Sequence, residues 1–300
     1  MGRHRITHSI PTCCILLVLV LSLPVSGNTA DRQKGFLWKV RSGTATVFLL
    51  GSIHAFNKEL YPLPARIEQA FGATDTLVVE ADINKINIEN IMTMLEGAFY
   101  PEDETLEKHL SLETFKRAEA KLMEFGLPIQ LFQRSKPWIL SMMITALELE
   151  KNKFDPEYGI DVHFLEEARD KKRILELESI DFQIKLFNSF SDTEQESFLL
   201  YTLKDADTMK EQMDLFLKAW NTGDTRALEA IVTKGPGEDR EVSQVYEKLL
   251  FNRNKEMASR IDGFLKTGGT YFVVVGAGHL VGEKGIPQIL RGMGYSVEQL

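Results

Sequence analysis

Thr46-Val-Phe-Leu-Leu-Gly-Ser-Ile-His54 is the stretch of this sequence that predicts a fold most directly. Its four consecutive apolar residues, Val47 to Leu50, are typical of a strand that is buried on both faces, as in parallel sheets. Gly51 interrupts the run, and a histidine follows three residues later. The stretch therefore predicts a buried strand with His54 at its carboxyl end.

The same pattern returns near the C-terminus as Tyr271-Phe-Val-Val-Val-Gly-Ala-Gly-His279. An apolar run again ends in a glycine, Gly276, and a histidine again follows three residues later. In open α/β sheets, ligands bind beyond the carboxyl ends of the strands. We therefore expect His54 and His279 to meet in space at one pocket.

Similar elements surround the two motifs. Residues 36–40 and 45–50 flank a glycine-bearing turn and predict a hairpin. A short helix follows Pro64, where a missing N–H costs nothing, and leads to a strand over 76–80 that ends on Glu80.

The last forty residues repeat this order, with a strand over 271–275, a helix around 286–292 and a strand from Tyr295. The predicted fold class is α/β, with a central sheet built from two β-loop-α-β units, an internal pseudo-repeat, and a large helical insertion at about 84–265.

Within the insertion, the pattern predicts helices and one short strand. Residues 173–177 predict that strand, and Glu178 follows it directly. The apolar spacing over 191–220 predicts one long helix that begins at a capping sequence. A further helix over 239–265 carries Arg253 in its middle.

Residues 1–27 predict a cleaved secretory signal peptide. Arg3 and Arg5 form a positive region, and the apolar core from Ile15 to Leu23 is shorter than the roughly 20 residues that cross a bilayer. An uncleaved anchor is the alternative. Cleavage would leave residues 28–300 as one exported domain, periplasmic or extracellular, with no integral membrane segment.

Composition limits the chemistry of the predicted mature chain. Both cysteines, Cys13 and Cys14, lie in the signal, so we expect no disulfide and no cysteine metal ligand. Loss of the two signal arginines takes the formal net charge from −8 to −10. Such an acidic chain lacks the basic footprint of a nucleic-acid-binding protein.

The two histidines and Glu80 are the candidate functional residues. Two neutral imidazoles with a carboxylate form an open site for a divalent metal ion, whose identity the pattern does not specify. The alternative is structural: the histidines would satisfy backbone groups at strand ends, and Glu80 would form a helix cap or a salt bridge. His109 and His163 lie on predicted polar helix surfaces and rank lower.

Several motifs together resemble the TraB/GumN family, which includes the animal Tiki proteins. They are Leu50-Gly-Ser-Ile-His-Ala55, Leu77-Val-Val-Glu80, Gly159-Ile-Asp161, Leu177-Glu178-Ser179, Arg253-Asn254 and Val275-Gly-Ala-Gly-His-Leu280, in family order from about Phe36 to Gln299. The resemblance implies a fold shared with erythromycin-esterase-like and ChaN-like proteins. It also implies a metal-dependent peptidase or hydrolase.

Carried over by position, the resemblance gives His54, His279 and Glu80 as metal ligands, with Glu80 as an alternative general base and Arg253 as a further catalytic candidate. Gly51, Gly276 and Glu178 are additional pocket candidates. Arg253 either holds a substrate carboxylate or oxyanion, or forms a structural ion pair with Glu178.

Two other functions remain open from the sequence. The protein could be a non-catalytic exported binding protein that sequesters a peptide or small signal in the same pocket. It could also be an esterase in which His and Glu activate water without a metal. The substrate in each case is a peptide or a small molecule, and the oligomeric state is not predicted.

Overall fold

The computed structural model describes residues 35–233 and 240–300. The predicted signal peptide lies outside these residues, so its cleavage stays a prediction. Six strands form one sheet in the order β4-β3-β5-β2-β1-β6. The strands are β1 (Leu37–Arg41), β2 (Ala45–Ser52), β3 (Thr76–Val79), β4 (Arg173–Glu176), β5 (Gly269–Gly276) and β6 (Ser296–Gln299).

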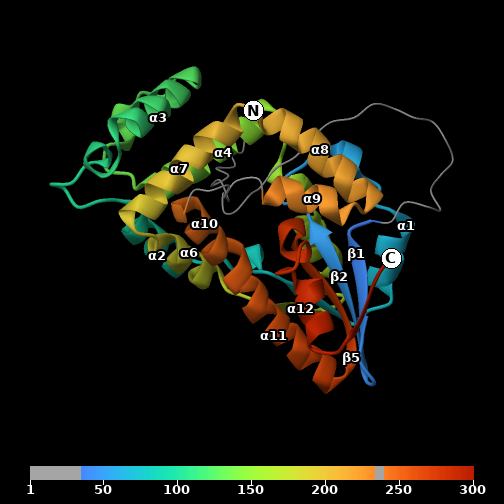
Figure 1. The fold of residues 1–300 in the computed structure, drawn as a ribbon. Coiled ribbons are helices and arrows are strands. Elements are labelled where there is room, and N and C mark those ends of the chain that lie inside the picture. Colours follow the sequence, from blue (N-terminus) through green and yellow to red (C-terminus); the bar gives the residue numbers. More distant parts are fainter. Residues whose placement is uncertain (1–34, 234–239) are drawn as a thin grey trace, which may run out of the picture.

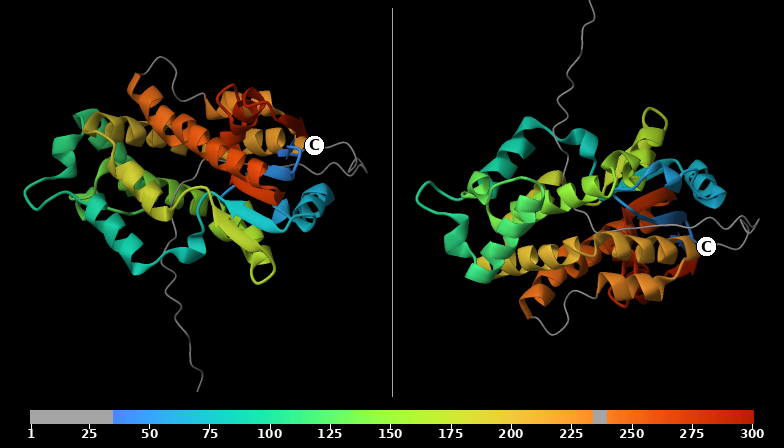
Figure 2. Two further views of the ribbon diagram at one scale, coloured as in Figure 1. Left: turned by 90° about the horizontal axis from the view of Figure 1, so that it is seen from below. Right: turned by 90° about the horizontal axis from the view of Figure 1, so that it is seen from above.

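Helices surround the sheet and also form a layer beyond its carboxyl end (Figures 1 and 2). The α-helices are α1 (Ala65–Gly72), α2 (Ile88–Ala98), α3 (Leu112–Glu124), α4 (Pro137–Lys151), α5 (Ile160–Ala168), α6 (Ile180–Asn188), α7 (Asp192–Ala206), α8 (Met209–Thr222), α9 (Thr225–Val232), α10 (Arg240–Tyr246), α11 (Asn252–Thr267) and α12 (Ile286–Gly292). A π-helical turn, Glu247–Phe251, joins α10 to α11. The mixed α/β class is thus confirmed.

The two strands that carry the histidine motifs are neighbours at the centre of the sheet. β2 and β5 pair in parallel over eight residues, with Leu50 opposite Val274 and Ser52 opposite Gly276. Their apolar residues are almost fully buried, which is the environment that the continuous apolar runs predict. Both strands therefore end at the same edge of the sheet, beside the end of β3.

The predicted hairpin is confirmed as β1 and β2, which pair antiparallel. The internal pseudo-repeat stays a prediction. After the first motif, β3 pairs in parallel with β5, whereas the strand after the second motif, β6, pairs antiparallel with β1. The strand that follows each motif therefore pairs differently: it is parallel to its neighbour in the first unit and antiparallel in the second.

Helices cover both faces of the sheet (Figure 2). On one face, Phe71 of α1 and Phe164 of α5 both contact Phe272 of β5, with ring centroids 5.4 and 4.9 Å away. On the other face, α11 crosses β2 and β5 and packs against α12. The sheet is therefore the middle layer of three, and its buried edge faces the remaining helices.

One long helix over 191–220 is wrong as a prediction. The structure has two helices, because α7 ends at Ala206 and α8 begins at Met209. Between them, the Thr208 hydroxyl and backbone N–H both donate to the Asp205 carbonyl oxygen, and the hydroxyl accepts a hydrogen bond from Gln212. Short polar side chains that bond locally compete with the helical pattern and explain the break.

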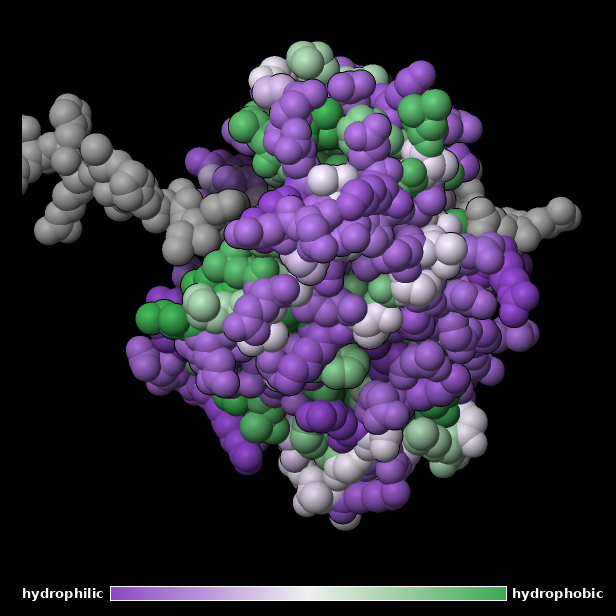
Figure 3. Space-filling model, turned by 90° about the vertical axis from the view of Figure 1, so that its left-hand side faces the viewer, coloured by the Kyte–Doolittle hydropathy of each residue, from purple (hydrophilic) through white to green (hydrophobic). Residues whose placement is uncertain are grey.

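Hydrophilic side chains cover most of the face in Figure 3, and hydrophobic ones gather in a few separate patches. No helix within residues 35–233 and 240–300 is long and apolar enough to span a membrane.

Candidate active site

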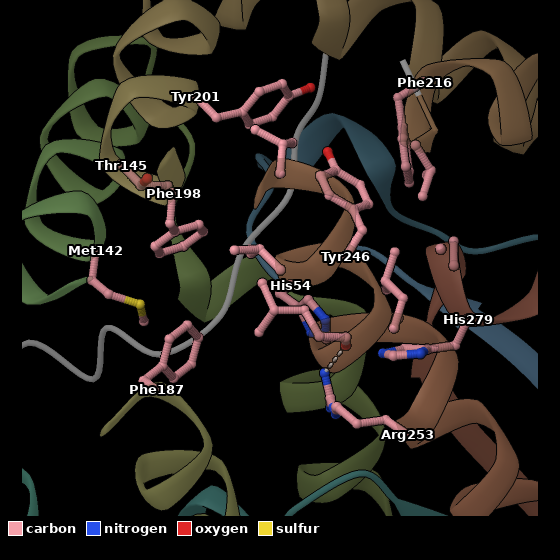
Figure 4. Close-up of a pocket in the computed structure, with 18 of the residues that line it drawn as sticks. His54, Met142, Thr145, Phe187, Phe198, Tyr201, Phe216, Tyr246, Arg253 and His279 are labelled. Carbon is pink, nitrogen blue, oxygen red and sulfur yellow. Dashed lines mark hydrogen bonds between the residues drawn. The ribbon is translucent and has the colours of Figure 1, made fainter. Parts of the chain in front are cut away.

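The site lies where β2, β3 and β5 end, below the layer formed by α4, α7 and α10 (Figure 4). A cavity of about 130 Å³ opens there. His54 and His279 both line it, together with Arg253 and Gly276. The structure thus brings the two histidines to one pocket, as the paired motifs predict.

Gly276 is the point on which the polar side chains converge. A Cβ atom placed on this residue would lie 2.9 Å from His54 Nε2, 3.3 Å from Glu80 Oε1 and 3.6 Å from His279 Cδ2. Its own N–H donates to Glu80 Oε1 at 2.5 Å. A glycine here leaves the space that the three side chains occupy.

His54 is held by an acidic partner that comes from α5. Its Nδ1 lies 2.8 Å from Asp161 Oδ2. The start of α5 packs directly on the His54 turn, since a Cβ on Gly159 would lie 2.5 Å from the His54 carbonyl oxygen. The Ile160 N–H also donates to the Ile53 carbonyl. This close approach places the Asp161 carboxylate against the imidazole.

The electrostatics of His54 follow from that partner. Burial lowers the pKa of the imidazole, but the Asp161 carboxylate and, more weakly, Glu80 outweigh this and raise the pKa to about 9. The side chain keeps 25% of its surface exposed. In the metal-free protein, His54 therefore carries a proton at neutral pH.

His279 has a neutral partner and a different charge. Its Nδ1 lies 2.6 Å from Asn254 Oδ1, and the Asn254 amide nitrogen donates to the Lys284 carbonyl oxygen. Because that second bond fixes the amide orientation, the His279 Nδ1 must carry the hydrogen, and Nε2 bears a lone pair. Burial lowers the pKa of His279 to about 3, so the ring is neutral.

Glu80 lies between the histidines and Arg253. Its Oε2 accepts a 2.7 Å hydrogen bond from Arg253, and its Oε1 lies 3.6 Å from His279 Nε2. Burial raises the pKa of Glu80, but the histidines, Arg253 and the Gly276 N–H outweigh it and lower the pKa to about 2. Glu80 is therefore ionised throughout the neutral range.

Arg253 is a buried ion-pair residue. Its Nε and Nη2 bind both oxygens of Glu178 at 2.8–3.1 Å, and Nη1 donates to the Leu249 carbonyl. The structural ion pair with Glu178 is thus present, and it extends to Glu80. Arg253 also lines the cavity.

Three predicted site residues, Glu80, Glu178 and Gly51, are not among the residues that line the cavity and lie behind those that do. Glu178 contacts Arg253 and Gln183 rather than the cavity. Gly51 packs under the second motif, because a Cβ there would lie 3.0 Å from both Cα and Cβ of Ala277. Its carbonyl oxygen accepts a hydrogen bond from the buried Trp220 indole.

The roles of Asp161 and Asn254 as histidine partners were missed by sequence reasoning. Each belongs to a quoted motif, Gly159-Ile-Asp161 or Arg253-Asn254, so the motifs were the available signal. Ser52, which also lines the cavity, was missed as well.

The fit to a metal ion can be tested on the donor atoms. Among residues 35–233 and 240–300, no group of three or more His, Cys, Asp or Glu side chains stands ready to hold a metal ion. Two donors are nevertheless paired: His279 Nε2 and Glu80 Oε1 both bear lone pairs and face each other at 3.6 Å. A cation between them would satisfy both, and imidazole nitrogen with carboxylate oxygen suits zinc-like ions.

The TraB/PrgY/gumN family model matches residues 36–299. The chain belongs to this family. An "Uncharacterized protein YbaP" of Escherichia coli strain K12 is 27% identical over 260 residues, which cover 83% of this chain and 89% of that protein.

A "Metalloprotease TIKI homolog" of Amphimedon queenslandica is 23% identical, over 96% of this chain and 68% of that protein. A "Metalloprotease TIKI2" of Xenopus tropicalis is 22% identical, over 94% and 64% respectively. No solved structure matches. The family of this chain is thus established, and some of the proteins that it resembles carry the name of a metalloprotease.

Proposed function

We propose that this protein is an exported, metal-dependent hydrolase that cleaves a peptide or another small carbonyl substrate. One observation carries the proposal: the neutral His279 imidazole, which lines the cavity, faces the ionised Glu80 carboxylate behind it at 3.6 Å. Two acceptors in this arrangement favour a cation. The metalloprotease names of distant family members support the same reading.

The surrounding charges also favour a cation. Glu80 and Glu178 pair with Arg253, and Asp161 pairs with His54. The negative charges of Asp161 and Glu80 outweigh burial and the opposing charge of Arg253, and they are the reason why His54 holds a proton in the metal-free protein. A divalent ion could take the place of that proton.

His279 and Glu80 would hold the ion, and His54 would supply a further donor from the other turn. When bound, the ion supplies a water whose pKa is near 7 and polarises the scissile carbonyl. Asp161 and Asn254 orient the two imidazoles through their Nδ1 atoms, as partners of metal-binding histidines commonly do.

The remaining steps belong to residues of the chain. Arg253 and the Gly276 N–H fix the Glu80 carboxylate. In the alternative arrangement, in which the histidines alone hold the ion, Glu80 would be the base that takes a proton from the attacking water. Arg253 also places a permanent positive charge beside the cavity, where it stabilises negative charge that develops on the reacting oxygen.

Hydrolysis of a peptide library by site variants tests this proposal. We expect His54→Ala, His279→Ala and Glu80→Gln each to lower activity by about 100-fold or more. His109→Ala is the control, because His109 bonds Asp192 and does not line the cavity. Urea unfolding of each variant separates loss of activity from loss of fold.

Two outcomes would replace the proposal. Hydrolysis that survives chelation would assign the chemistry to His54 and Glu80 without a metal. Absence of turnover in the wild type, with a ligand that both histidine variants fail to bind, would support the sequestering protein instead.

A further inference from the structure

Ser52 carries a buried hydroxyl without a partner at the edge of the site. It is the last residue of β2, is 1% exposed, and lines the cavity. Its Oγ has no hydrogen-bond partner among the residues that the structure describes. Buried hydroxyls are usually paired, so an unpaired one that faces a cavity calls for a ligand.

The sheet register directs this hydroxyl towards the candidate centre. Ser52 pairs with Gly276 across the parallel strands β2 and β5. Side chains at paired positions project from the same face of a sheet. At Gly276 that direction leads to His54 Nε2 and Glu80 Oε1. Ser52 therefore projects beside the groups that would carry out the chemistry.

Apolar side chains predominate on the far side of the cavity, where the hydroxyls of Thr145, Ser197 and Tyr201 also belong to the lining. Figure 4 shows Met142, Phe187 and Phe198 on the side opposite Arg253 and His279. Val245 and Leu249 continue this wall. We call these five residues the apolar wall. The wall belongs to α4, α6, α7, α10 and the π-helical turn, which form the layer beyond the sheet.

Charge is confined to the sheet end of the cavity. Among the described residues that line it, the ionisable groups other than tyrosine are His54, Arg253 and His279. The apolar wall offers no counter-ion to an acidic or basic substrate side chain, which would lose its hydration without compensation. An apolar side chain loses nothing there and gains from burial.

These observations fix how a substrate would lie. We propose that Ser52 Oγ donates a hydrogen bond to the reacting carbonyl oxygen of an amide or ester whose neighbouring side chain is apolar and lies on the apolar wall. The inference rests on the proposed hydrolase and adds its substrate class and a substrate-binding residue. Ser52 acts as a donor, and no covalent bond forms to it.

Binding of N-acetyl amino-acid amides, followed by ligand-detected NMR, tests the inference without any need for turnover. We expect the phenylalanine and leucine amides to bind the wild type at least about tenfold more tightly than the aspartate and lysine amides. Equal binding of charged and apolar amides would overturn the substrate class.

Variants test separately the residue that would bind the substrate carbonyl and the wall that would bind its side chain. Ser52→Ala should weaken binding of N-acetyl-phenylalaninamide about tenfold, and Ser52→Thr should restore it. Ser141→Ala is the matched control, because this buried hydroxyl bonds its own helix at Pro137 and does not line the cavity. Unchanged binding in Ser52→Ala would overturn the donor role.

On the apolar wall, Phe198→Ala should also weaken binding, whereas Phe182→Ala, an exposed residue outside the cavity, should not. Equal effects of the two would overturn the wall assignment. A covalent adduct on Ser52 after treatment with a p-nitrophenyl ester would identify a nucleophile and contradict the donor role. Efficient hydrolysis of peptides without this preference would leave the proposed function intact and sink only the inference.

Discussion

The two Gly-x-x-His turns have nearly the same sequence pattern and sit side by side, yet they hold their histidines in opposite states. His54 is partly exposed, bonded to a carboxylate and protonated. His279 is buried, bonded to an amide and neutral. The motif thus determines where an imidazole lies, whereas its charge depends on its surroundings: the Asp161 carboxylate keeps His54 protonated, and burial keeps His279 neutral.

The glycines that begin the two turns, Gly51 and Gly276, also have different neighbours. Substituting them should give the largest differences in stability and activity. Gly51→Ala would press on Ala277, including its backbone, so we expect a loss of about 1–3 kcal/mol in the free energy of unfolding. Gly276→Ala would press mainly on the ends of the His54 and Glu80 side chains. These can move, so we expect the fold to survive and hydrolysis to be lost.

Urea unfolding and the hydrolysis assay, applied to both variants, separate the two cases. If the shared Gly-x-x-His pattern alone decided the outcome, both substitutions would change stability and activity equally. A stable Gly51→Ala protein, or a Gly276→Ala protein with full activity, would therefore contradict the distinction. Gly43→Ala is a matched control, because a Cβ on Gly43 has no atom within 4 Å.

Substitution of Asp161 should have a smaller effect, because it removes the charge difference between His54 and His279 without filling space. In metal-free protein, Asp161→Asn takes away the main cause of the raised pKa of His54, so this pKa should fall from about 9 towards 6.5 or below. Titration of the histidine Cε1 proton by NMR measures it. His279 should stay neutral down to about pH 3 in both proteins. A pKa of His54 that does not move would show that Asp161 is not the cause.

The raised pKa of His54 also makes the free energy of unfolding depend on pH. A folded-state pKa above the unfolded value means that the protonated His54 is favoured in the folded protein. This contribution is complete below about pH 6.5 and is lost as the pH rises through about 9. The stability difference between wild type and Asp161→Asn should therefore shrink as the pH rises from about 6.5 to about 9.

The sequence predicts the strands and the meeting of His54 with His279, because continuous apolar runs identify buried parallel strands and strand ends gather at one edge. Glu80 is predictable for the same reason. The partners of the histidines are not predictable in this way. Asp161 reaches His54 through the packing of α5 on its turn, and Asn254 reaches His279 from α11, and both contacts depend on tertiary docking.

Local hydrogen bonds also divide the predicted long helix over 191–220 into α7 and α8. The apolar spacing continues from α7 into α8, but the Thr208 N–H and hydroxyl both bond the Asp205 carbonyl, three residues back, in place of the helical i→i−4 partner. The apolar wall shows the same limit. Its residues come from four helices and a π-helical turn that meet only after the chain folds.

The metal content of protein purified without a histidine tag, measured by elemental analysis, tests the metal-dependent site most directly. We expect about one divalent ion per chain in the wild type, lost on chelation and strongly reduced in His279→Ala and Glu80→Gln, while His109→Ala keeps it. A wild-type protein that holds no divalent ion after incubation with zinc, manganese or cobalt, or variants that hold as much as the wild type, would contradict it.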